Sequence, residues 1–227
     1  MNRPTTYWHW IVIALSVWFS YVLTLYTIPL HKHICINPTD LLATAKTGDI
    51  LLFVATDYHA MFHLINPYSH IAVIVRTTDG DSYVVEAHND DSGPGNRYPK
   101  GIFMYPLKER ATPTAFTTPY FVRLQRPIGD REPHIDRDAL ARQVNKWNVG
   151  IEYNKSYKMD EALCHFLGIR PNIKKKMHCA NFAAMLLHHL GIASSNAVYD
   201  CIRPIDVVST LALVPGYAYT HIQPVAK

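Results

Sequence analysis

The sequence predicts an α+β domain that follows one N-terminal transmembrane helix. Strand-like segments come first, between residues 49 and 125, and helical segments come after Pro133. This segregated order is typical of α+β proteins, in which an antiparallel sheet packs against helices. A long apolar run at residues 7–30 precedes both parts. About 190 of the 227 residues remain after that run, which is enough for one domain with a hydrophobic core.

The composition excludes several classes of protein. Hydrophobic residues make up 48% of the chain and charged residues 18%, which argues against disorder. The net charge of +4 comes without a long basic tract, so no nucleic-acid partner is expected. The cysteines form no CxxC pair, which indicates neither a zinc site nor a redox pair, and they are too few for a disulfide scaffold. They are Cys35, Cys164, Cys179 and Cys201.

The run YWHWIVIALSVWFSYVLTLYTIPL at residues 7–30 predicts a single-pass membrane anchor. It contains no Asp, Glu, Lys or Arg, and its one histidine is His9. A helix of this length reaches about 36 Å at roughly 1.5 Å per residue, whereas the hydrocarbon core is about 30 Å thick. A cleaved signal peptide is the alternative, but the run is long for one and no A-x-A site follows it. We therefore expect residues 1–30 to be an anchor in the lipid bilayer, with either orientation open.

The rest of the chain divides into three expected parts. Residues 31–47 are expected to form a stalk with a short helix, which begins near Asn37 and ends at Gly48. The main domain is expected at residues 48–215, and residues 216–227 are expected to be a C-terminal tail.

The sheet is predicted from runs of β-branched and apolar residues. Residues 78–81, Thr-Asp-Gly-Asp, are a hairpin turn signal between two of these runs. About five strands are expected, and the last two are the weaker ones. They lie at residues 49–55, 70–76, 82–88, 102–105 and 120–125.

Three helices are predicted after Pro133, at residues 136–148, 159–167 and 179–190. The third, CANFAAMLLHHL, has the clearest helical spacing of apolar residues and is closed by Gly191. One face of this helix is expected to pack on the sheet. It carries Cys179, Phe182, Ala183, Leu186, Leu187 and Leu190.

Cys179 is the candidate nucleophile. A thiol nucleophile needs a fixed position, a favoured thiolate and a base within reach. Cys179 begins the third helix, where the positive end of the helix favours a thiolate and backbone N–H groups can bind an oxyanion. The lysines at 174–176 add positive potential. The alternative interpretation is an ordinary core cysteine.

Two strands supply candidates for the base and for the residue that orients it. His70 opens the strand at 70–76, and Glu86 interrupts an apolar strand, where a carboxylate is costly to bury unless it is paired. If the two strands pair through their turn, Glu86 lies beside His70 and orients its imidazole. His88 lies on the same face and is the alternative third member, since only one of them can lie directly opposite His70. A structural histidine and a solvent-facing glutamate are the alternative interpretations.

Six short segments resemble, in chain order, a known family. They are Gly48–Leu51 (GDIL), Ser69–Ile74 (SHIAVI), Val84–Ala87 (VVEA), Gly150–Asn154 (GIEYN), His178–Phe182 (HCANF) and Arg203–Ser209 (RPIDVVS). Together they resemble the permuted papain-like, NlpC-type superfamily of cysteine peptidases and amidases, in its YiiX-like branch. The matches cover about residues 48–210, which is nearly all of the chain after the anchor.

The resemblance implies a fold and a set of site residues. The fold is an antiparallel half-barrel sheet packed on the nucleophile helix, with the histidine strand and the acidic strand before the nucleophile, the reverse of papain. The implied triad is Cys179, His70 and Glu86, and Tyr153 is implied near the oxyanion site. The related lecithin:retinol acyltransferase group has a second histidine where this chain has Glu86. Ala180 stands where the family usually has Ser or Glu, which leaves the substrate class open.

The expected function is that of a membrane-anchored, thiol-dependent hydrolase or amidase. Attack by Cys179 on a peptide, amide or lipid acyl group would give an acyl-enzyme, with no metal and no cofactor. The alternatives are a lipid-directed acyltransferase or phospholipase, and a catalytically inactive membrane-tethered module.

Other residue pairs are weaker candidates for a site. Cys164 and His165 are neighbours on a predicted helix and do not face each other. His31 and His33 lack further metal ligands near them in the sequence, and the pair His188–His189 is expected at the surface or at the edge of the core.

Overall fold

The computed structural model describes most of the chain after Ile34 and two short pieces before it. The described residues are 12–13, 16–18, 35–55, 67–88, 101–113, 117–150, 152–153, 176–195 and 202–226. The chain divides into two compact units, Met1–Ile34 and Cys35–Lys227. Within the described residues, no helix is both long enough and apolar enough to cross a membrane. Most of the expected anchor at 7–30 lies outside the described residues.

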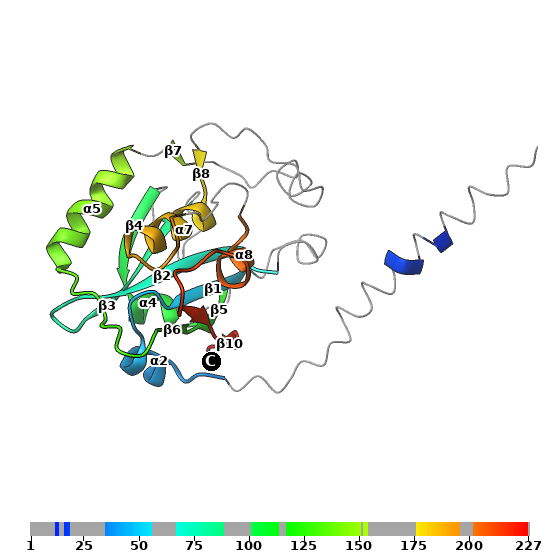
Figure 1. Ribbon diagram of the computed structural model, residues 1–227, viewed down its shortest axis with the longest axis horizontal. Coiled ribbons are helices and arrows are strands. Elements are labelled where there is room, and N and C mark those ends of the chain that lie inside the picture. Colours follow the sequence, from blue (N-terminus) through cyan, green and yellow to red (C-terminus); the bar gives the residue numbers. More distant parts are fainter. Residues whose placement is uncertain are drawn as a thin grey trace, which may run out of the picture. The chain divides into compact units, whose positions relative to one another are not determined.

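The centre of the second unit is an antiparallel sheet (Figure 1). In the described part of the chain it has six strands, in the order β10-β5-β1-β2-β3-β4. The prediction of an α+β fold with an antiparallel sheet is therefore confirmed. Four strands lie within one residue of their predicted ranges, whereas β5 begins three residues before the predicted range of 120–125 and ends at Val122. The sixth strand, β10, comes from residues expected to be a tail. The strands are β1 Ile50–Ala55, β2 His70–Arg76, β3 Ser82–His88, β4 Gly101–Pro106, β5 Thr117–Val122 and β10 Gln223–Pro224.

Five helices and two small two-stranded sheets surround this sheet in the described residues. The predicted helices at 136–148 and 179–190 correspond to α5 and α7, whereas the one predicted at 159–167 lies outside the described residues. The helices are α2 Pro38–Thr44, α4 Leu107–Ala111, α5 Arg137–Gly150, α7 Cys179–His189 and α8 Pro204–Ser209. The small sheets pair β6 Leu124–Gln125 with β9 Ala218–Tyr219, and β7 Glu152–Tyr153 with β8 Lys176–Met177.

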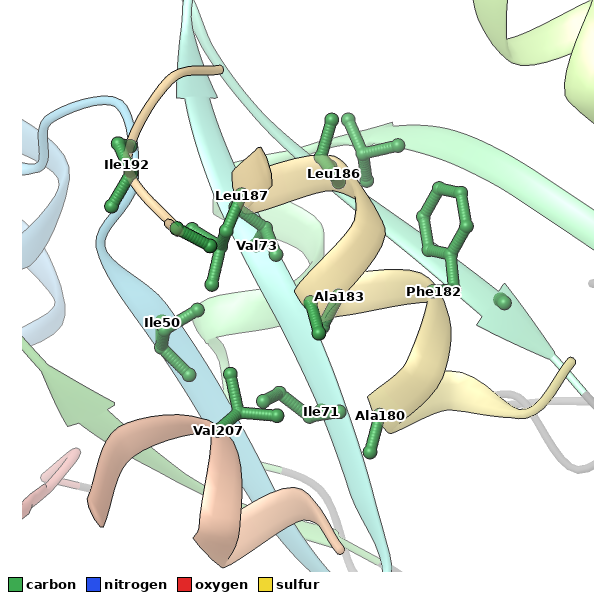
Figure 2. Packing of buried hydrophobic residues seen from close by; sticks show 14 of the residues in the cluster. Ile50, Ile71, Val73, Ala180, Phe182, Ala183, Leu186, Leu187, Ile192 and Val207 are labelled. Carbon is green, nitrogen blue, oxygen red and sulfur yellow. The ribbon is translucent and has the colours of Figure 1, made fainter. Parts of the chain in front are cut away.

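The sheet carries an apolar layer on each face, because successive side chains of a strand point to opposite sides. On one face α7 packs against the sheet, and Figure 2 shows Ala180 at the start of this helix beside Ile71 of β2. On the other face a second cluster joins α2 and α4 to the sheet through residues such as Leu41 and Leu107.

The predicted face of α7 is confirmed by its burial. Phe182, Ala183, Leu186 and Leu187 are each at most 1% exposed. Ala180 and Ala184 are also fully buried, so the helix is covered on more than the predicted stripe. Burying a large aliphatic or aromatic side chain contributes about 1.5 to 3 kcal/mol. The packing of α7 on β2 and β3 therefore fixes where its first residue, Cys179, lies.

A tight connection fixes the start of β1. Gly48 has φ +91°, and a Cβ atom there would lie 2.5 Å from a side-chain carbon of Ile192. The next residue, Asp49, is buried, and its carboxylate accepts the backbone N–H groups of Lys46 and Leu124 at 2.9 and 2.8 Å. Only glycine fits at position 48, because of its left-handed conformation and the close approach of Ile192. The Asp49 carboxylate links this turn to Leu124, the first residue of β6.

The two ends of the second unit meet at the β10 edge of the sheet. The N–H of Ile36 donates to the carbonyl oxygen of Pro224 at 3.0 Å, and the N–H of Ala226 donates to the carbonyl oxygen of Ile36 at 2.9 Å. Asn37 then caps α2, because its side-chain oxygen accepts the N–H of Thr39 at 2.9 Å. The second unit thus begins structurally at Ile36.

Deleting residues 1–34 should leave a folded domain, because all of these contacts remain. Deleting residues 1–37 should lower the free energy of unfolding by about 2 to 3 kcal/mol, since it removes two backbone hydrogen bonds and the cap of α2. Chemical denaturation of both truncated proteins measures the difference. If the protein that lacks residues 1–34 aggregates, and the full chain can be extracted without detergent, the N-terminal segment belongs to the core.

Candidate functional site

Glu86 is a carboxylate in the interior of the protein, and it collects three basic side chains. Its side chain is fully buried in β3, between the apolar residues Val85 and Ala87. Its Oε2 contacts His70 and its Oε1 contacts His88, while Arg110 contacts both oxygens. Burial by itself raises the pKa of Glu86, but the charge of Arg110 and the hydrogen bonds of the two histidines hold that pKa well below its usual range. Glu86 is therefore an anion, and the predicted cost of burying it is met by pairing.

His70 is held by this carboxylate through one ring nitrogen. It is the first residue of β2, and its Nε2 lies 2.7 Å from Oε2 of Glu86. An ionised carboxylate can only accept, so Nε2 carries the proton and Nδ1 is the basic nitrogen of the ring. Burial lowers the pKa of His70, and the bond to Glu86 offsets part of that effect. His70 is thus a neutral imidazole with a fixed tautomer, as the predicted pairing with Glu86 requires.

His88 lies beside His70 as well as Glu86, whereas the sequence offered Glu86 and His88 as alternatives for the residue that orients His70. The two imidazole rings are stacked, with centroids 5.0 Å apart and planes 20° apart. Nε2 of His88 lies 3.2 Å from Oε1 of Glu86, the oxygen that His70 does not use. One carboxylate with two oxygens can serve two imidazoles on the same face of the sheet, which explains the difference.

Arg110 completes the cluster and was not predicted from the sequence. It lies on α4, is 5% exposed, and contacts both oxygens of Glu86, through Nε at 2.6 Å and Nη2 at 2.8 Å. Its guanidinium also lies 4.6 Å from the ring centroid of Phe53, which pairs with His70 across β1 and β2. A buried glutamate in an apolar strand signals that a cationic partner exists, but the five residues of α4 show no periodicity that would identify it.

Cys179 lies near the start of β2, on the other face of the sheet from the Glu86 cluster. The residue begins α7, is half-buried, and carries a thiol outside any disulfide. Its side chain packs with the apolar layer on the α7 face. His70 lies on the opposite face, because it alternates along β2 with Ala72 and Ile74. The backbone N–H of Ile71, the residue after His70, lies close enough to the sulfur to lower its pKa. Cys179 therefore lies against the backbone at the end of β2 from which His70 projects.

The resting form of Cys179 differs from the sequence expectation. Burial raises the pKa of its thiol to about 12, and the charge of Glu86 adds to this, although the backbone N–H groups of Ile71 and Ala180 act in the opposite direction. The position at a helix N-terminus was expected to favour the thiolate. Loss of solvent outweighs the N–H groups here, so the thiol is neutral at rest and its ionisation requires a base.

His178 caps the helix that carries Cys179. It is 8% exposed, and its Nδ1 accepts the backbone N–H of Ala180 at 3.3 Å. Burial lowers the pKa of His178 to about 4, so the ring is neutral and acts as an acceptor. Histidine replaces the Ser, Thr, Asp or Asn that usually occupies this position. The sequence shows His178 next to Cys179 but gives no sign of its capping role.

The other predicted residues lie in different places. Tyr153 lies in β7, which pairs in parallel with β8 so that Tyr153 is opposite Met177, two residues before Cys179. His188 and His189 are exposed near the end of α7. Residues 31, 33, 164, 165 and 201 lie outside the described residues.

The donor atoms of His70, Glu86 and His88 lie within 4.8 Å of one another, which is close enough for a metal ion. Arg110 already binds both carboxylate oxygens, and a divalent cation would have to enter beside its buried charge. The arrangement suits a proton-transfer group better than a metal site, because a charged guanidinium repels a cation and stabilises the carboxylate.

The comparison of this chain with protein-family models and with curated proteins gives no match.

Proposed function

We propose that this protein is a membrane-anchored, thiol-dependent hydrolase or acyltransferase, with Cys179 as nucleophile, His70 as base and Glu86 as the residue that orients the base. The observation that carries the proposal is the bond from Nε2 of His70 to the buried carboxylate of Glu86. This bond leaves Nδ1 as the basic nitrogen, at the strand end where Cys179 lies against Ile71. The order of His70, Glu86 and Cys179 along the chain also supports the permuted papain-like arrangement.

The reaction proceeds in two steps. Nδ1 of His70 takes the thiol proton as the sulfur of Cys179 attacks the carbonyl carbon, and backbone N–H groups at the start of α7 bind the oxyanion. The imidazolium then gives its proton to the leaving amine or alcohol, which departs and leaves a thioester on Cys179. In the second step His70 removes a proton from water or another acceptor, which attacks the thioester carbonyl carbon. The C–S bond then breaks, the acid or transferred acyl product leaves, and the imidazolium returns its proton to the sulfur of Cys179. Glu86 stabilises the imidazolium in both steps.

A lipid acyl substrate is the second candidate. The apolar stretch at 7–30 ends only a few residues before Ile36, where the second unit begins. A domain tied this closely to a bilayer acts where lipids are concentrated. Cleavage of peptide or amide reporters, compared with release of fatty acid from a phospholipid reporter, separates the two substrate classes.

The reactivity of Cys179 relative to Cys35 distinguishes an enzyme from an inactive module. A bystander thiol whose pKa is about 12 should react roughly 1,000-fold more slowly at pH 7 than an ordinary exposed thiol. If His70 removes the proton during attack, Cys179 should instead react with iodoacetamide at least as fast as the exposed Cys35. Peptide mass spectrometry of the full chain after brief alkylation gives both rates in one sample. Slow alkylation of Cys179 at all pH values below 9 would support the inactive module.

Glu86 and His88 should differ in their effect on this reactivity. Glu86→Gln should slow the alkylation of Cys179 at pH 7 by about 10-fold or more, because His70 loses its anionic partner while Arg110 keeps its charge nearby. His88→Gln should change the rate little, since His88 contacts the other oxygen of Glu86. Circular dichroism establishes that each variant is folded. A selective loss of reactivity in His88→Gln would make His88 the third member, as in the acyltransferase pattern.

A further inference from the structure

Arg110 gives the site a permanent positive charge at its centre. The guanidinium is 5% exposed and binds Glu86 with two nitrogens, Nε at 2.6 Å and Nη2 at 2.8 Å. Arginine stays protonated in proteins, so the Arg110–Glu86 pair has no net charge at any physiological pH. The two histidines of the cluster therefore face an ion pair and not a lone anion.

The position of Arg110 is itself fixed by packing. Its helix, α4, follows β4 directly, and Leu107 and Ala111 are buried in the cluster on this face of the sheet. The guanidinium also lies over the ring of Phe53, 4.6 Å from its centroid, and Phe53 pairs with His70 in the sheet. Arg110 and His70 thus both contact Oε2 of Glu86, and Arg110 also contacts Oε1.

The balance of protons in the cluster depends on this charge. A buried carboxylate without a fixed counter-charge would bind a proton at neutral pH, and an imidazole in contact with it would carry that proton. His70 would then be protonated on Nδ1 as well as on Nε2, and it would have no lone pair for the thiol of Cys179. Arg110 prevents this, because the carboxylate is already neutralised and still accepts the Nε2–H of His70.

We propose that Arg110 is a positioning residue of the site, which supplies the counter-charge that lets Glu86 fix the Nε2–H tautomer of His70 without adding a proton at Nδ1. This inference rests on the proposed function, in which Nδ1 is the base. Nε and Nη2 of Arg110 contact the carboxylate of Glu86, the same carboxylate that bonds Nε2 of His70.

The groups that face His70 define the test. They are Glu86 and His88 on β3 and Arg110 on α4, with Tyr105 of β4 against the ring of His88. Of these, Arg110 and Glu86 carry opposite charges at neutral pH. A change in the charge of Arg110 should therefore appear in the titration of His70.

The experiment compares three variants of the full chain by the NMR titration of the His70 imidazole. Arg110→Gln keeps a donor to Glu86 but removes the charge, and it should raise the pH midpoint of His70 by about 1 or more. Arg110→Lys keeps the charge, and its midpoint should stay near that of the wild type. Lys108→Met removes a charge from the exposed side of the same helix and is the matched control, with no shift expected. In the plot of Cys179 alkylation rate against pH, the fall in rate at low pH should shift by the same amount as the pH midpoint of His70.

An unchanged or lowered His70 midpoint in folded Arg110→Gln would overturn the inference, and so would an equal shift in Lys108→Met. If Arg110→Gln does not fold, the double variant Glu86→Gln/Arg110→Met removes both charges together. Its His70 midpoint should stay within about 0.5 of the wild type, and a rise of about 1 would overturn the inference. The NMR titration does not depend on catalysis, so slow Cys179 alkylation in the wild type would reject the proposed function without deciding the role of Arg110.

Discussion

The buried carboxylate of Glu86 is the constraint on which the arrangement of the site depends. A lone carboxylate in an apolar strand would cost several kcal/mol, so the fold must bring donors to it, from its own strand and from two other elements. β2 supplies His70, β3 supplies His88 and α4 supplies Arg110. Each donor is placed by apolar packing on the same face of the sheet. The requirement to satisfy one buried charge therefore also fixes the imidazole proposed as the base.

The proposed nucleophile and the proposed base lie on the two faces of the sheet. α7 covers one face and the Glu86 cluster lies on the other, with Cys179 against the backbone of Ile71, the residue after His70. Burial keeps the thiol of Cys179 protonated and keeps His70 neutral, so the resting pair carries no charge. In this state the base removes the thiol proton while the sulfur attacks. A thiolate–imidazolium pair does not form before the attack. Exclusion of water then also protects a thioester from uncontrolled hydrolysis.

The sequence predicted the strands and helices whose residues show a clear period, and it missed the elements that only their neighbours define. β10, Gln223–Pro224, has no strand pattern and exists because β5 has an open edge. The pairing of Glu86 with His70 was predictable, since a carboxylate in an apolar strand needs a partner close by. Arg110 was not, because it lies 24 residues from Glu86 on a helix of five residues. The raised pKa of Cys179 follows from packing of the whole domain, which helix position alone does not reveal.

The rate of Cys179 alkylation as a function of pH, in the wild type and in His70→Asn, tests the central claim most directly. His70 is proposed as the base for a thiol whose pKa is about 12, so the buried thiol should be reactive at neutral pH only when His70 is present. The account predicts that His70→Asn slows alkylation at pH 7 by about 100-fold or more, with the exposed Cys35 unchanged. Equal rates for Cys179 in the two folded proteins would contradict it.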